Sequence, residues 1–267
     1  MKRKIDIQEL RHIQLSILDD VHEFCTQNGL KYSLAGGTLL GAIRHKGYIP
    51  WDDDIDLIMP RTDYETFIRT YQSEQNEIIE LRKVDYCVEL FCKVCRKNTI
   101  MTDLLLGRGQ WGINIDIFPV DGCPENYVEE AETIRILREK LAKICPYYKT
   151  AAPIKRFTWF LKYCIKRVLY FYPHSVKHLK MTIDSIAYRE NLFEREKAGV
   201  KIGGHGIKEM LNNQVYRSYS LVEFEGKSYY IISDYAPFLI AMYGDYMKLP
   251  PKEKQVTHHL YDAFVIE

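Results

Sequence analysis

Apolar and polar residues alternate with two different periods along this chain, which predicts both helices and strands. Near the start, every third or fourth position is apolar from Leu10 to Phe24, and Gly29 follows as a natural helix end. Over residues 112–120 the apolar positions instead recur at every second residue, the pattern of a half-buried strand. The chain therefore combines both element types.

The same patterns predict the remaining elements. Strands are expected over 31–34, 54–59, 78–84 and 86–96. Thr62 and Glu65 form a capping-box pattern that predicts a helix from Thr62 to about Gln75. Further helical segments are expected over 39–43, 125–145 and 153–197, and a hairpin and a last helix over 221–232 and 234–243.

This order of elements predicts an α/β (α+β) fold with a mixed-sheet core. With 267 residues, the chain is long enough to bury a core without disulfides or a structural metal. We expect one domain in three parts: a core in 1–124, a helical region in 125–200 and a closing hairpin-plus-helix unit in 201–267.

The amino-acid composition excludes some classes of function and indicates the cellular compartment. Lys and Arg number 37 against 36 Asp and Glu, so the chain lacks the basic excess of a nucleic-acid binder. Its 7 cysteines are odd in number and scattered, which favours free thiols in a reducing compartment. The start does not resemble a signal peptide, and no apolar run is long enough to cross a membrane. We therefore expect a cytoplasmic protein.

Acidic residues at the start of one predicted strand are the clearest chemical signal. Asp52, Asp54 and Asp56 share one side of the strand as far as it extends, whereas Asp53 points to the other side and is expected to be structural. Such crowded carboxylates need a compensating cation, and Mg²⁺ or Mn²⁺ suits hard oxygen ligands. A solvated acidic turn after Pro50 is the alternative.

Three further features surround this acidic segment. Gly36-Gly37-Thr38 ends a predicted strand where backbone amides would bind phosphate, although a Gly-Gly pair is often only a turn. A third carboxylate, Asp116, lies in a separate apolar strand, where a lone charge would be costly. Basic candidates for phosphate binding are Arg44, His45, Lys46 and Lys93, the last in an apolar strand where its amine needs a phosphate or an Asp as partner.

Together, a glycine turn, an Asp-x-Asp strand and a distant third Asp resemble the nucleotidyltransferase (polymerase-β-like) superfamily. Residues 36–47 and 49–56 further resemble the signature of LicD-type phosphotransferases, and fukutin-related proteins share a looser version. Residues 116–119 and 243–247 also fit that family. The similarity is dense over about 32–68 and 112–121, and the middle of the chain carries no recognised motif.

The resemblance implies Mg²⁺-dependent transfer of phosphocholine from CDP-choline to a sugar hydroxyl of teichoic acid or lipopolysaccharide. Asp54 and Asp56 would bind the metal, Asp52 would be a third ligand through water, and Asp116 would bind the metal or accept the hydroxyl proton. Alternatives are transfer of phosphoglycerol, phosphoribitol or a nucleotide, or a non-catalytic glycan- or nucleotide-binding protein on the same scaffold.

The substrates suggest two more sites. Choline is a quaternary ammonium that aromatic rings bind, and Tyr48, Trp51 and Trp111 flank the acidic motifs. Residues 153–180 are basic and rich in aromatic residues, which suits contact with the inner face of an anionic membrane that carries a lipid-linked glycan acceptor. The alternative is a helix that packs its aromatic residues on the core. Cys92 and Cys95 are expected to be core thiols.

Overall fold

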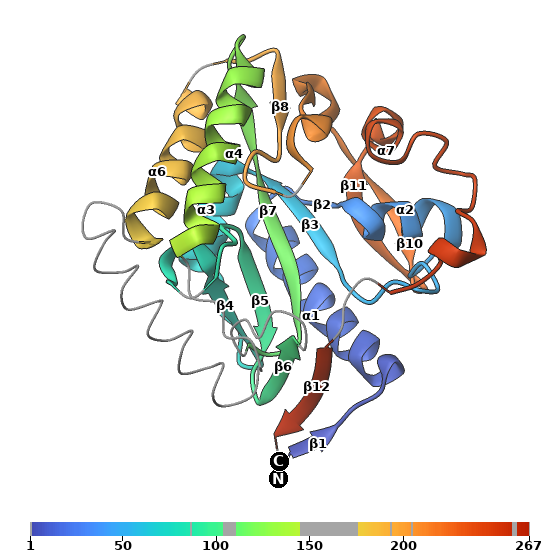
Figure 1. Cartoon of the computed structure of the whole chain (residues 1–267). Coiled ribbons are helices and arrows are strands. Elements are labelled where there is room, and N and C mark those ends of the chain that lie inside the picture. Colours follow the sequence, from blue (N-terminus) through green and yellow to red (C-terminus); the bar gives the residue numbers. More distant parts are fainter. Residues whose placement is uncertain are drawn as a thin grey trace.

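The computed structural model describes residues 2–85, 87–103, 111–144, 176–192, 194–203, 205–257 and 261–266. A seven-stranded mixed sheet lies at its centre (Figure 1). Five strands follow the order β2 (Ser33–Leu34), β3 (Asp56–Pro60), β7 (Asn114–Cys123), β5 (Cys92–Arg96) and β4 (Asn76–Glu80). Only β3 and β7 are parallel neighbours along this path. The predicted α/β (α+β) class with a mixed-sheet core is confirmed.

The remaining two strands of this sheet extend it at the far end of β7. There β7 pairs with β8 (Lys197–Gly199), which pairs with β9 (Leu211–Asn212). A hairpin of β10 (Tyr219–Phe224) and β11 (Lys227–Ile232) forms separately, as the sequence predicts, and α7 (Tyr235–Tyr243) follows it. Asp234 precedes α7, but its side chain makes no capping hydrogen bond.

The main core combines helices from the start of the chain with the sheet and the hairpin. α1 (Ile7–Asn28) begins at Asp6, whose carboxylate accepts the Glu9 N–H at 2.9 Å, and ends at Gly29 with a φ of 66°. α2 (Gly36–His45) leads from β2 toward the acidic segment and is longer than the predicted 39–43. Apolar side chains of α1, α2, β3, β7 and the hairpin pack together in this core.

A second core lies between α4 (Tyr127–Ile144) and α6 (Val176–Arg189), on the opposite side of the molecule from α7 (Figure 1). Within the predicted membrane segment 153–180, only residues 176–180 are described. Val176 and Leu179 are buried in this core, and so is the aliphatic stem of Lys180 beside it. Residues 176–180 contain none of the aromatic residues of this segment, and 153–175 lie outside the described part of the chain, so the membrane contact and the packing alternative both stay predictions.

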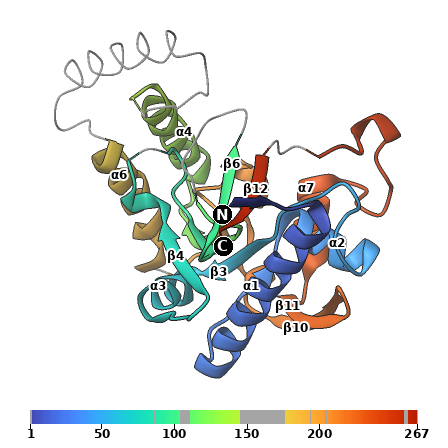
Figure 2. The same cartoon turned by 90° about the horizontal axis from the view of Figure 1, so that it is seen from below.

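Three short strands that the pattern did not predict form a separate sheet. β12 (Tyr261–Ile266) pairs on one side with β1 (Lys2–Lys4) and on the other with β6 (Thr99–Asp103). The two ends of the chain therefore lie side by side, as Figure 1 and Figure 2 both show. Two predicted strands are also shorter than expected, because β5 begins only at Cys92 and a 3-10 turn follows β4 at Leu81.

The predicted capping box at Thr62 is wrong. α3 (Arg61–Thr70) already begins at Arg61, and its preceding residue, Pro60, makes no side-chain cap. Glu65 instead binds the guanidinium groups of Arg61 and Arg82. Two guanidiniums, the Arg61 one buried and the Arg82 one half-buried, are stronger partners for a carboxylate than one backbone amide, so tertiary packing overrides the local signal.

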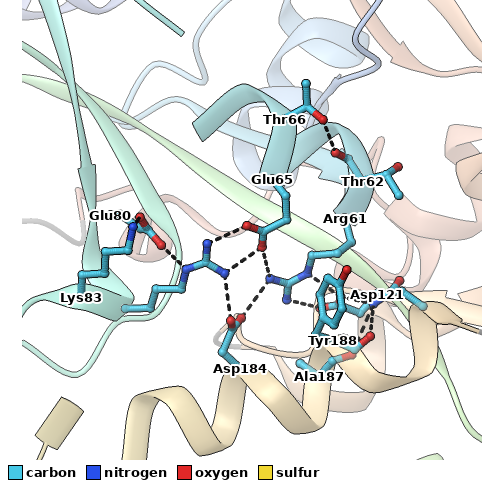
Figure 3. Close-up of polar contacts among 12 residues, drawn as sticks. Arg61, Thr62, Glu65, Thr66, Glu80, Lys83, Asp121, Asp184, Ala187 and Tyr188 are labelled. Carbon is cyan, nitrogen blue, oxygen red and sulfur yellow. Dashed lines mark hydrogen bonds and ion pairs between the residues drawn. The ribbon is translucent and has the colours of Figure 1, made fainter. Parts of the chain in front are cut away.

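These contacts belong to a buried network, here called the arginine network, at the carboxyl ends of β3 and β7 (Figure 3). Arg61 donates two hydrogen bonds of 2.7 Å to the two oxygens of Asp121 on β7 and a third of 2.9 Å to Asp184 on α6. Arg82 contacts the other oxygen of Asp184 at 2.8 Å and also binds Glu65 and Glu80. The network therefore fastens α6 to α3 and β7.

A search for membrane-spanning elements covered only the described residues. None of their helices has the length and apolar character needed to cross a bilayer.

Candidate active site

Two carboxylates and one amine form a row across three strands of the sheet. Asp56 at the start of β3 is the register partner of Asp116 on β7, and Asp116 is the register partner of Lys93 on β5. Register partners on neighbouring strands point to the same face, so the three side chains lie together. Sequence positions 56 and 116 thus meet although 60 residues separate them.

Lys93 has Asp116 as its partner. Its Nζ lies 2.5 Å from Asp116 Oδ1 and 3.1 Å from Asn114 Oδ1, and the amine also sits over the ring of Trp111 at 5.5 Å from the centroid. Burial alone would lower the pKa of Lys93, but the Asp116 carboxylate raises it overall. Of the two partners predicted for this amine, the structure shows the Asp.

The charge at Asp56 is poorly compensated. Burial raises its pKa well above the ordinary value, and the negative charges of Asp116 and then Asp52 raise it further, while Lys93 acts weakly in the other direction. A shift in this direction means that the site disfavours the ionised carboxylate unless a further cation approaches.

The two glycines at the start of α2 let these carboxylates come close. A Cβ on Gly36, which has a φ of 51°, would meet Asp56 Oδ2 at 3.0 Å, and a Cβ on Gly37 would overlap Asp52 Oδ2. Both carboxylates thus lie against a helix N-terminus, whose amide groups and dipole favour negative charge. Thr38 is buried, and its hydroxyl accepts the Asp56 N–H at 2.9 Å, so it fixes the start of β3.

Helix α1 holds the acidic segment from behind. Arg11 donates to the backbone carbonyls of Pro50 and Asp52, and Gln14 donates to the carbonyl of Asp53 at 3.0 Å. The Asp53 side chain is buried and accepts the Thr257 hydroxyl at 3.1 Å. This contact gives Asp53 the structural role that the alternation predicts.

A cleft of about 1050 Å³ opens beside the acidic segment. Of the residues predicted from sequence for metal, phosphate or choline binding, it is lined by Gly36, Gly37, Arg44, Trp51, Asp52, Asp54 and Asp56. Asp116 and Lys93 lie on the neighbouring strands and join this group through Asp56, without lining the cleft themselves.

The other predicted residues lie away from the cleft lining. Lys46 is exposed at the end of α2, with a φ of 62°, and His45 packs edge-on against Trp51. Tyr48 is buried, donates to Gln14 Oε1 at 3.1 Å and lies under the Arg11 guanidinium, which is a core arrangement. Trp111 contacts Lys93 and not the cleft.

The opposite wall of the cleft comes from residues for which local sequence patterns predict no role. They are His205, Tyr243, Asp245, Tyr246, Lys248, Leu249, Pro250, Pro251 and Lys254. Arg44 Nη1 anchors this wall by donating to the carbonyl of Tyr246 at 2.8 Å. Burial and the charges of Asp56 and Asp52 raise the pKa of Tyr243. The 243–247 motif was the one available signal.

A second missed residue is Glu209. Its side chain is buried, and its Oε2 has no hydrogen-bond partner in the described part of the chain. Burial raises the pKa of Glu209 to about 8, and its charge acts on both Asp56 and Tyr243. Sequence periodicity offers no signal for such a group, because it lies in a short 3-10 turn, η3 (Gly206–Glu209).

The chemistry of these donors fits a hard divalent cation. Among the described residues, no three His, Cys, Asp or Glu side chains already form a metal site. Mg²⁺ does not require one, because it keeps several waters and is usually bound by one or two carboxylates together with substrate phosphates. Asp52, Asp54 and Asp56 offer such carboxylates in one cleft, and the raised pKa of Asp56 marks the need for positive charge.

The Cys-x-x-Cys pair gives no alternative metal centre. Cys92 and Cys95 are buried free thiols, like the other three cysteines within the described residues. Burial raises the pKa of the Cys92 thiol, so it has no tendency to ionise and bind zinc.

Comparison with known proteins places this site in a family. Residues 29–136 match the family described as LicD/FKTN/FKRP, nucleotidyltransferase domain. The chain is also 30% identical to the lipopolysaccharide cholinephosphotransferase LicD of Haemophilus influenzae, over 99% of this chain and 100% of that protein. This chain belongs to the LicD family. The predicted resemblance and the transferase class are thereby confirmed.

Two other relatives of this LicD-family chain share only part of its length. An uncharacterised protein of Rickettsia prowazekii is 28% identical over 162 residues, which cover 60% of this chain and 58% of that protein. One from Rickettsia typhi is 45% identical over 56 residues, covering 21% and 18%. The LicD family match over 29–136 contains Asp52, Asp54, Asp56 and Asp116.

Proposed function

We propose that this LicD-family chain transfers phosphocholine from CDP-choline to a sugar hydroxyl of a lipid-linked glycan precursor of lipopolysaccharide or teichoic acid, with Mg²⁺ or Mn²⁺ as cofactor. The observation that carries the proposal is the in-register pair of Asp56 and Asp116 beside a glycine-bordered cleft. The name of the Haemophilus influenzae relative, a lipopolysaccharide cholinephosphotransferase, supports the choice of substrate.

The proposed reaction gives each group of the cleft a role. Asp54 and Asp56, with Asp52 through water, would hold the metal ion, which supplies positive charge to the donor phosphates. The N-terminal amides of α2 at Gly36 and Gly37 and the Arg44 guanidinium would bind phosphate oxygens. Trp51 in this cleft provides the ring for the trimethylammonium group, and Tyr243 and Tyr246 of the opposite wall join it.

The reaction exchanges one phosphorus–oxygen bond for another. The acceptor hydroxyl oxygen attacks the choline-bearing phosphorus, the bond from that phosphorus to the bridging oxygen breaks, and CMP leaves with the bridging oxygen. Asp116 accepts the hydroxyl proton, and Lys93 holds this carboxylate in place through its 2.5 Å contact. The site therefore needs Asp116 unprotonated and a cation near Asp56.

The decisive experiment identifies both the donor and the phosphorus that is attacked. The protein is incubated with Mg²⁺ and with CDP-choline, CDP-glycerol or CDP-ribitol, with and without a glycan acceptor, and the products are resolved by chromatography. With CDP-choline, we expect release of CMP and transfer of phosphocholine to the glycan acceptor. Phosphocholine release would instead indicate nucleotide transfer, and CMP release only with CDP-glycerol or CDP-ribitol would change the donor.

A matched pair of variants tests the site. Asp56→Asn should lower the turnover number by about 10³-fold or more, because a ligand that stabilises transferring charge is lost, while the melting temperature does not fall. Asp53→Asn is the control, since Asp53 lies in the same segment but binds Thr257. Tight binding of CDP-choline with no turnover under any condition would indicate a non-catalytic binding protein.

A further inference from the structure

One edge of the cleft carries a group of large apolar side chains that are about half exposed. We call it the apolar rim: Ile207, Ile240, Tyr243, Met247 and Leu249. Ile240, Met247 and Leu249 are 58%, 56% and 53% exposed. Single exposed apolar residues are ordinary, but a group gathered at one edge usually marks a surface that another body covers.

The rim is continuous with the mouth of the cleft. Ile240 and Tyr243 belong to α7, Ile207 belongs to the 3-10 turn η3 that contacts α7, and Met247 and Leu249 follow α7 directly. Tyr243 and Leu249 also line the cleft. Pro250 and Pro251 restrict the backbone of the segment that carries the rim. Figure 1 shows α7 and this segment on the side of the molecule away from α4 and α6.

Charge around the rim identifies its occupant. Lys208, Lys248, Lys252 and Lys254 are exposed within or beside it, against two exposed acidic residues, Asp245 and Glu253. Lysine is depleted from the cores of protein–protein interfaces, whereas apolar side chains with tyrosine and lysine are typical of segments that enter the surface of an anionic bilayer.

We propose that the apolar rim docks on the surface of an anionic lipid bilayer and turns the cleft toward it. Ile240, Met247 and Leu249 enter the headgroup region, and the lysines contact lipid phosphates. The docking proposal depends only on the exposed side chains of the rim and its surroundings. Its use, delivery of a lipid-linked acceptor to Asp116, rests on the proposed function.

Sedimentation of the full chain with vesicles tests the proposal. Vesicles of phosphatidylcholine alone are compared with vesicles that also contain phosphatidylglycerol. We expect binding to the anionic vesicles that weakens with salt. Replacing Ile207, Ile240 and Met247 together by Ser, none of which lines the cleft, should weaken it by about tenfold or more. The pair Lys208→Ser and Lys252→Ser should weaken it less and reduce its salt dependence.

The control is an equal loss of exposed apolar surface elsewhere. Val128, Ile136 and Met181 on α4 and α6 are 55%, 41% and 47% exposed, and their replacement by Ser should leave vesicle binding unchanged. Loss of binding in this control, or no vesicle binding by the wild type, would overturn the proposal. A dimer that only the rim variant disrupts would assign the rim to a second copy instead. CMP release from CDP-choline is measured separately, so failure of the proposed function remains distinguishable.

Discussion

The two ends of the parallel pair β3 and β7 use the same kinds of residue in opposite ways. At their carboxyl ends, Asp121 and Asp184 each contact a guanidinium of the arginine network, and the pKa of Glu65 is lowered because its bonds to Arg82 and Arg61 outweigh burial. At the amino ends, Asp56 meets Asp116 and Asp52, and its pKa is raised by burial and by their charges. Burial is common to both ends.

The two ends differ in whether the protein itself neutralises the charge of the carboxylates. This difference distinguishes a structural cluster of charged residues from a functional one. In the arginine network the protein itself supplies the cations, so the ions are stable with nothing else bound. At the amino ends, the Lys93 amine neutralises the charge of Asp116. At Asp56, burial and neighbouring negative charges favour the binding of a proton or a cation. A buried carboxylate with a raised pKa in a cleft is thus a better functional signal than an acidic cluster alone.

Breaking the arginine network should give the largest effect. Arg61→Ala leaves Asp121 and Asp184 as buried charges that have lost a partner, so the free energy of unfolding should fall by about 3–5 kcal/mol. Urea denaturation measures it. Arg135→Ala, which removes exposed ion pairs on α4, is the matched control and should cost no more than about 1 kcal/mol. An equal fall of the unfolding free energy in Arg61→Ala and Arg135→Ala would contradict the structural role of the arginine network.

Glu209 gives a smaller effect with a defined dependence on pH. Its pKa is about 8 in the folded protein and 4.5 ordinarily, so folding retains a proton and this carboxyl makes stability fall as pH rises from about 4.5 to about 8. Glu209→Gln removes that loss. Relative to wild type, the variant should gain about 2–3 kcal/mol of unfolding free energy between pH 5 and pH 7, since each pH unit between the two pKa values is worth about 1.4 kcal/mol.

Chemical denaturation at the two pH values measures this gain. Glu253→Gln changes an exposed carboxyl outside the site and should track the wild type at both pH values. A constant offset between Glu209→Gln and wild type would mean that Glu209 is already ionised in the folded protein.

Addition of Mg²⁺ should change the unfolding free energy least. It tests most directly whether the two ends of β3 and β7 differ in their need for a cation. If the amino ends of β3 and β7 need a cation, Mg²⁺ at ten times its dissociation constant stabilises the folded protein by about 1.4 kcal/mol. Thermal unfolding with and without chelator measures the shift. Asp53→Asn should keep it and Asp56→Asn should lose it. An undiminished shift in Asp56→Asn would place the ion elsewhere.

Local patterns predicted most long elements but not how they meet. The alternation over 112–120 identifies β7, because buried and half-buried residues alternate from Ile115 to Phe118 in that strand. The register that joins Asp116 to Asp56 is set by pairing across 60 residues, and only the family resemblance indicated that the two would meet. Short strands such as β1 and β12 escaped notice because three to six residues carry little periodic signal.

Only the family motif at 243–247 indicated the second wall of the cleft, because its position also depends on how distant elements pack. Tyr243, Tyr246 and Lys248 gain their roles only from where α7 packs, and their sequence neighbourhood is that of an ordinary apolar helix followed by a turn. Tyr48 shows the converse. Its place beside the acidic motif suggested choline binding, but its ring lies under Arg11 and its hydroxyl binds Gln14.

The support that α1 gives to the acidic segment has a practical meaning for anyone who would isolate the catalytic part of this chain. Arg11 and Gln14 bind the backbone at Asp52 and Asp53, and both precede residue 29, where the family match begins. Thr257, which binds the Asp53 side chain, lies far beyond its end at residue 136. A fragment trimmed to 29–136 would keep Asp52, Asp54, Asp56 and Asp116 and lose the side chains that hold the acidic segment in position.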